Sequence, residues 1–298
     1  MKRILKKSAA VLSLLIVLTS CGVRAGGGET GGLKIIATIF PVYDFTRAVA
    51  GGLADVSVLI GPGASIHSYD PSVYDIKRIN ECDAFICVGG ESEAWTDRFD
   101  LSGKTVVRLI ECVEPLEEDG GSGEYDGHIW TSPFNATLCV SAIAEALAER
   151  EPENADDYRK NAEDYNREID AAERETAEII AGAKRKKIIV ADRFALLYFT
   201  ERFGLEYEAA LSACGDRSGA SVATVARLIE TVKAEGIPYV YYAELSGGDI
   251  ANAVSRETGA GTLLLHSCQN VTEEEFNRGE TYVSLMRKNA ENLKKGLN

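Results

Sequence analysis

Short apolar runs alternate with longer amphipathic segments along this chain, and no other feature limits its fold as strongly. Before residue 111 the apolar runs are LKIIATIF (33–40), VSVLI (56–60), AFICVG (84–89) and TVVRLI (105–110). After residue 185 they are KKIIVA (186–191), YEAAL (207–211), YVYYAEL (239–245) and TLLLH (262–266). Helical spacing connects these runs, with helices expected near 193–203, 219–235, 248–258 and 273–297 in the second half. This order predicts an α/β fold with two lobes, each a mainly parallel four-stranded sheet with flanking helices.

An amphipathic segment of about thirty residues separates the two halves. Its apolar and aromatic residues recur at spacings of four and three, with charges between them, at Tyr158, Ala162, Tyr165, Ile169, Ala172, Thr176 and Ile179. The pattern predicts a helix of roughly 45 Å that starts at Pro152. A coiled-coil seam has the same spacing, but tyrosine and alanine make a thin seam over about four heptads. We therefore expect one backbone helix (151–184) that joins an N-terminal lobe (33–150) to a C-terminal lobe (185–298), with a cleft at the strand ends.

The N-terminal stretch MKRILKKSAAVLSLLIVLTSC is typical of an export signal rather than of the fold. Four positive charges precede an apolar run that is too short to span a membrane, and small residues lead into Cys21. The end of this stretch resembles a bacterial lipobox, which implies that residues 1–20 are removed and that Cys21 carries a lipid. An ordinary signal with an incidental cysteine is the alternative. The glycine-rich residues 21–32 then form a flexible tether, and we expect the protein at the extracytoplasmic face of the cell membrane.

The charge balance excludes some partners. The formal net charge of −14 becomes −18 without the first twenty residues, because these hold four positive charges and no acid. Such a chain repels nucleic acid and attracts cations, although an acidic surface also serves solubility. Six cysteines follow Cys21, and none of them forms a C-x-x-C pair, so we expect no structural zinc cluster.

Only three histidines occur, and each follows a strand or a strand-like turn. His67 lies in GPGASIHSYDPS, His128 lies in YDGHIWTSPFNA, and His266 ends TLLLH. Loops at the strand ends of open α/β sheets face the cleft, and neutral imidazole is the commonest side-chain ligand for zinc. The placement favours a shared metal site over three unrelated surface or capping residues.

Several segments resemble the substrate-binding lipoproteins of zinc and manganese ABC transporters. They are IIATIFPVYDFTRAVAG, GPGASIHSYDPS, DGHIWTSPFNA and ADRFALLYFTERFGLEY, and the resemblance spans essentially the whole chain after the tether. It implies two lobes on a rigid backbone helix, a metal ion held between them, and delivery of that ion to a membrane permease by a monomer. The first two ligands carry over to His67 and His128.

The other two ligand positions depart from the family pattern. Arg193 in RFALLYF stands at the third ligand position, and His266 in LLLHSC stands at the fourth. Arginine cannot bind a cation, because its guanidinium has no lone pair to offer. In one hypothesis His266 supplies the third nitrogen, Glu244, Cys268 or water completes the shell, and Arg193 turns away to pair with Asp192 or Glu244. A disulfide between Cys214 and Cys268 would remove Cys268 from this set.

In the other hypothesis the metal site is lost and Arg193 marks a pocket for an anionic or chelated ligand. We favour the first, since three histidines remain, and nitrogen and sulfur donors suit zinc better than manganese.

The predicted function is therefore capture of a divalent transition metal, zinc before manganese, for an ABC permease. One alternative is a lipoprotein of the same architecture that binds a metal chelate, haem or corrinoid, with Trp95, Trp130, Phe194 and Tyr198 as aromatic walls. Another is an adhesion lipoprotein with a degenerate metal site. We expect no enzyme, because G-x-S-x-G, P-loop and H-E-x-x-H motifs are absent from the sequence. The loop EEDGGSGEYDG (117–127), which stands where many zinc-binding relatives carry a histidine-rich loop, contains no histidine.

Overall fold

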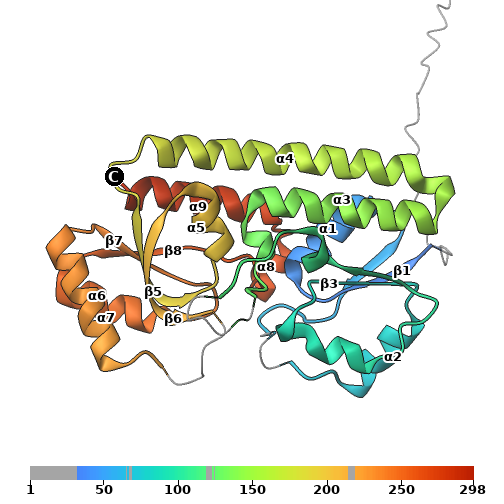
Figure 1. Ribbon diagram of the computed structural model, residues 1–298, viewed down its shortest axis with the longest axis horizontal. Helices are drawn as coiled ribbons and strands as arrows, with labels where there is room; N and C mark the ends of the chain where they lie inside the picture. The colour runs from blue at the N-terminus through green and yellow to red at the C-terminus, as the bar shows by residue number, and fades with distance from the viewer. Residues whose placement is uncertain (1–31, 65, 67–68, 119–122, 124, 214–218) are drawn as a thin grey trace, which may run out of the picture. The chain divides into compact units, whose positions relative to one another are not determined.

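The computed structural model of the protein describes residues 32–64, 66, 69–118, 123, 125–213 and 219–298, which form two parallel four-stranded sheets (Figure 1). The first sheet has the order β2-β1-β3-β4, with β1 (Lys34–Ala37), β2 (Asp55–Val58), β3 (Ala84–Cys87) and β4 (Thr105–Arg108). The second has the order β6-β5-β7-β8, with β5 (Lys187–Phe194), β6 (Glu206–Ser212), β7 (Tyr239–Tyr242) and β8 (Gly261–Leu264). Both sheets place their first strand between the second and the third. The α/β fold predicted from the sequence is confirmed.

Helices and short 3-10 turns connect these strands. In the first half they are α1 (Phe40–Ala50), α2 (Val73–Glu81), η2 (Glu91–Arg98), η3 (Leu109–Cys112), η4 (Ile129–Thr131) and α3 (Pro133–Arg150). In the second half they are α5 (Leu197–Phe203), α6 (Val222–Glu235), α7 (Asp249–Thr258), α8 (Glu273–Asn277) and α9 (Tyr282–Gly296). Over the described residues, no helix is both long and apolar enough to span a membrane.

The long helix predicted between the halves is α4 (Ala155–Ala181), preceded by the 3-10 turn η5 (Pro152–Asn154). Its buried residues follow the predicted spacing, except that Ile180 rather than Ile179 faces inward at the last turn. The helix packs on α1, α3 and α9 of the same chain, so its apolar stripe needs no coiled-coil partner (Figure 1). We call the part of the chain before α4 the N-terminal lobe and the part after it the C-terminal lobe.

A buried carboxylate joins three of these helices. Asp44 of α1 is fully buried, and it accepts hydrogen bonds from the side chain of Arg47 (2.7 Å), the hydroxyl of Tyr165 in α4, and the backbone N of Tyr282 in α9 (2.8 Å). Burial, followed by the charge of Asp44, raises the pKa of the Tyr165 phenol well above its usual value, so the phenol remains a donor. Residues of both sheets and of α4 share one apolar core, and Gly32–Asn298 forms a single compact unit.

Arg193 does not begin a helix, contrary to the helix predicted near 193–203. Strand β5 continues to Phe194, with a register shift between Val190 and Arg193, and Arg193 pairs with Leu211 of β6. The carboxylate of Asp192 accepts the backbone N of Arg193 (2.7 Å), and α5 begins only at Leu197. A local side-chain bond and an irregular strand end thus outweigh the helical spacing of these residues.

Candidate functional site

His128 is buried at the end of the loop that follows the first sheet, directly before η4. Its Nδ1 lies 2.8 Å from Asp126 Oδ1, and the same oxygen accepts the backbone N of His128 (2.6 Å). An ionised carboxylate only accepts hydrogen bonds, so the ring proton is on Nδ1 and the lone pair is on Nε2. A carboxylate on the second ring nitrogen is the usual outer partner of a histidine that binds a metal. His128 is therefore held in the tautomer that a metal site requires.

A hollow of about 350 Å³ borders His128. Side chains from both lobes line it, with Glu91, Glu118, Tyr125 and His128 from the N-terminal lobe and Gln269 from the C-terminal lobe. His67 lies outside the described residues, and so do Cys21 and Cys214. Ile66 and Tyr69, the described residues on either side of His67 in the sequence, both line this hollow.

His266 has the opposite ring arrangement. It is 2 % exposed, and its Nδ1 accepts the backbone N–H of Cys268 (2.8 Å), which puts the ring proton on Nε2. That Nε2 has no hydrogen-bond partner among the described residues. The backbone N and O of His266 both bond to the side chain of Asn289 in α9 (2.7 Å each). His266 lies outside the residues that line the hollow beside His128, and in this tautomer it presents no lone pair to a metal.

Two other expected ligands, Glu244 and Cys268, are engaged in the structure of the loop after β8. Glu244 accepts the backbone N of Ser267 (2.8 Å) and the hydroxyl of the same serine, while one of its oxygens lies 3.7 Å from His266 Nδ1. Cys268 is fully buried, and burial raises the pKa of its thiol well above the usual value. A thiol, unlike a thiolate, is a poor metal ligand. Cys268 carries a free thiol, and its suggested disulfide partner Cys214 lies outside the described residues.

Arg193 turns away from the expected acids. One of its guanidinium nitrogens donates to the carbonyl oxygens of Ser212 (3.1 Å) and Ala213 (3.0 Å) at the end of β6. The acids that were expected to pair with it bond to other donors: Asp192 accepts the backbone N of Arg193 and of Ala243, and Glu244 accepts from Ser267. Arg193 and Glu244 nevertheless both line a second hollow, of about 310 Å³.

Gln269 lines both hollows, and sequence reasoning missed it. Its carboxamide oxygen is a neutral donor suited to a divalent cation. Because loops at strand ends face the cleft, the sequence did indicate the loop after β8 as part of the site. Within that loop it favoured His266, a scarce residue type, over Gln269. In the described part of the chain, no three His, Cys, Asp or Glu side chains are grouped to hold a metal ion.

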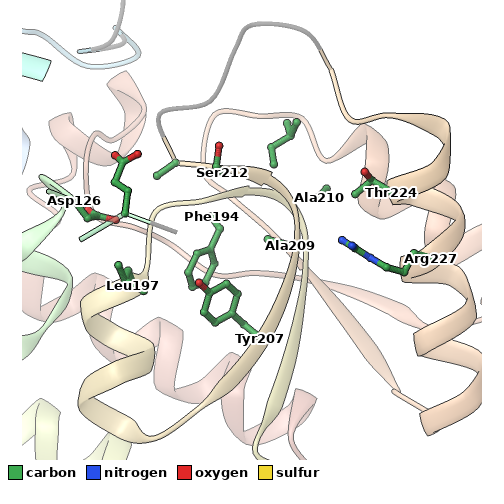
Figure 2. Close-up of a pocket in the computed structure, with 12 residues that line it drawn as sticks. Asp126, Phe194, Leu197, Tyr207, Ala209, Ala210, Ser212, Thr224 and Arg227 are labelled. Carbon is green, nitrogen blue, oxygen red and sulfur yellow. The ribbon is translucent and has the colours of Figure 1, made fainter. Parts of the chain in front are cut away.

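The expected aromatic walls are dispersed. Phe194 stacks on Tyr207 at 3.7 Å between ring centroids, in a pocket that Asp126 of the N-terminal lobe also lines (Figure 2). Trp130 is buried and donates its indole N–H to Ser267 O (2.8 Å), and Trp95 packs against Tyr69 in the N-terminal lobe. Within the described part of the chain, Phe194, Trp95 and Trp130 line three different pockets and therefore form no common wall for a flat macrocycle.

A family model described as "Zinc-uptake complex component A periplasmic" matches residues 35–296. The zinc-binding lipoprotein AdcA of Streptococcus pneumoniae is 32 % identical over 99 % of this chain, which spans 61 % of that relative's length. The high-affinity zinc uptake system protein ZnuA of Bacillus subtilis is 25 % identical over 96 % of each chain. The Zn(II)-bound ZnuA-like domain of AdcA has a TM-score of 0.78 and 32 % identity, with 90 % of this chain and 99 % of that domain covered. The laminin-binding protein Lmb of Streptococcus agalactiae, described as having adhesin and metal-transporting activity, has a TM-score of 0.80 and 26 % identity, with 90 % and 100 % covered.

Proposed function

This chain belongs to the family of periplasmic zinc-uptake component A proteins, and on that premise we propose that it captures zinc between its lobes and delivers it to an ABC permease. The observation that carries the proposal is His128, whose Nδ1 is bonded to Asp126 beside a hollow that both lobes line. The carboxylate fixes the ring and makes Nε2 a stronger base, which favours coordination of a cation.

We place His67 and His128 at the centre of the ligand set. The loop after β8 supplies a further donor, and the tautomer of His266 makes the Gln269 oxygen the better candidate in the described arrangement. His266 and Glu244 would join only if the bonds to Cys268 N and Ser267 were exchanged for the metal. Two imidazoles favour zinc, and a carboxamide oxygen leaves manganese as the second choice.

The same proposal covers the place of action. The lipid on Cys21 would hold the protein at the extracytoplasmic face of the membrane, where the monomer meets its permease. We propose a carrier without catalytic activity, since its chemistry needs only binding and release.

Metal loading of chelator-treated protein tests the function. We expect one zinc per chain by elemental analysis, a higher melting temperature with zinc than with manganese, and an affinity about a hundredfold or more weaker in His128→Ala. A wild-type melting temperature that neither metal moves would refute the metal-carrier function. A shift with a metal chelate alone would instead support the chelate-binding alternative.

Adhesion is a second candidate, favoured by the likeness to Lmb. Binding of the metal-free protein to immobilised laminin, unchanged in His128→Ala, would support an adhesive surface that is independent of the metal.

A further inference from the structure

Side chains of the C-terminal lobe hold both N-terminal segments that lead to the proposed histidine ligands. The first segment ends at Asp126 and His128. The second, Gly61–Ala64, leads to His67 in the sequence. Each of these segments bonds to one buried side chain from beyond α4.

Tyr198 of α5 holds the first segment. The residue is 3 % exposed, and its hydroxyl accepts the backbone N of Leu116 (2.9 Å) while it donates to the carbonyl of Asp126 (2.8 Å). The carboxylate of the same Asp126 bonds to the ring of His128. Burial raises the pKa of Tyr198 to about 12, so the hydroxyl keeps its proton at neutral pH. The phenol therefore fixes the backbone from which the partner of His128 extends.

Asn270, in the loop after β8, holds the second segment. It is 7 % exposed, and its amide Nδ2 donates to the carbonyls of Gly61 (3.0 Å) and Ala64. Its Oδ1 accepts the backbone N of Val271 (2.7 Å), and Gly63 N donates in return to Val271 O (2.9 Å). All polar groups of this side chain thus act on backbone, and its neighbour Gln269 lines the hollow beside His128.

On the basis of the proposed function, we propose that Tyr198 and Asn270 are positioning residues, through which the C-terminal lobe holds the histidine-bearing segments of the N-terminal lobe in the geometry that binds zinc. Metal affinity then depends on contact between the lobes as well as on the ligands. If the lobes part, the phenol and the amide leave their carbonyl partners, and the bound metal loses the support that keeps its ligands aligned. Separation of the lobes by a permease would therefore lower affinity without protonation of a ligand.

Isosteric variants test this inference. Tyr198→Phe removes only the hydroxyl, and Asn270→Asp turns the donor toward two carbonyls into an acceptor. Each should release zinc about tenfold faster in a stopped-flow chelator assay, with little change in the association rate. The cobalt(II) absorption bands of Tyr198→Phe should also change, because a misaligned imidazole alters the ligand field.

Matched controls carry the same atomic changes far from the site. Tyr158→Phe removes a buried hydroxyl that donates to Glu151, and Asn161→Asp removes an amide that donates to Val49 O (3.0 Å). We expect both controls to lower the melting temperature of the metal-free protein while leaving zinc release and the cobalt spectrum as in the wild type. Release from Tyr198→Phe and Asn270→Asp at the rate of the controls would overturn the inference.

Two measurements without metal separate this inference from the proposed function. The chain has three histidines, so imidazole NMR signals are few, and His128→Ala identifies the signal of His128. That signal should move in Tyr198→Phe but not in Tyr158→Phe, and hydrogen exchange at Gly63 N should accelerate in Asn270→Asp but not in Asn161→Asp. If the wild type binds no zinc, the proposed function fails, while unchanged metal-free signals would still refute positioning by the C-terminal lobe.

Discussion

His266 lies just after strand β8, whereas His128 lies at the end of the long loop that follows β4 and η3, and their surroundings arrange the two imidazole rings in opposite ways. In the N-terminal lobe a carboxylate accepts from Nδ1 of His128 and leaves the lone pair on Nε2. In the C-terminal lobe a backbone N–H donates to Nδ1 of His266, so that Nε2 keeps the proton and is buried without a partner among the described residues. The partner of one ring nitrogen, rather than the position at a strand end, decides whether an imidazole can bind a cation.

Two carboxylates, one in each lobe, differ in how completely they are hydrogen-bonded. Glu244 in the C-terminal lobe accepts both the backbone N and the hydroxyl of Ser267. Glu93 in the N-terminal lobe is fully buried, and it accepts Gly89 N (2.7 Å) with one oxygen while the other has no partner in the described part of the chain. Burial of this incompletely bonded group raises its pKa to about 7.

The largest expected effect is on zinc affinity, and it should come from weakening the bond between Asp126 and the ring of His128. Asp126→Asn keeps the size of the side chain but removes the charge that fixes the ring and makes Nε2 a stronger base. Zinc affinity, measured by competition with a chelator, should fall by about a hundredfold. Asp100→Asn, which changes an exposed acid, serves as the control. Equal affinities in Asp126→Asn and wild type would show that the carboxylate does not prepare His128.

A smaller effect should follow from the unequal carboxylates. The folded pKa of Glu93 lies above the ordinary value of 4.5, so the folded state retains a proton that the unfolded state has lost between these values. Its contribution to the free energy of unfolding should therefore decline by about 2 kcal/mol from about pH 5 to about pH 8. Glu93→Gln should lack this decline and should be the more stable protein at the higher pH. Urea denaturation across this pH range measures the difference, and parallel pH profiles of the two proteins would contradict it.

The smallest expected effect concerns His266. In His266→Ala the backbone bonds to Asn289 can persist, so zinc affinity should change by less than about threefold, although loss of the buried ring should lower the free energy of unfolding by about 2 kcal/mol. Isothermal titration and thermal melting give the two values. A much larger loss of affinity would show that His266 exchanges its bond to Cys268 N for the metal and would restore it to the ligand set.

Sequence patterns predicted the sheets and the long helix better than the candidate metal site. Alternating apolar runs indicated both sheets, and the spacing from Tyr158 to Thr176 indicated the buried stripe of α4, because these patterns report burial directly. The role of His266 could not be read in this way, since it depends on a backbone N–H two residues later, and Cys268 adopts a left-handed φ of 61° that favours glycine. Arg193 was misplaced for a similar reason, because a bond from its own N to Asp192 and a strand irregularity override its helical spacing.

The carboxylate of Asp44 also has a bearing on how the protein is made. Its partners Tyr165 and Tyr282 follow it by 121 and 238 residues. During synthesis the first helix, with Arg47, therefore emerges long before the phenol and the backbone N–H that complete the hydrogen bonds of its buried acid. A nascent chain that stops short of Tyr282 keeps this acid incompletely bonded, so the first lobe completes these hydrogen bonds only once α9 has been made.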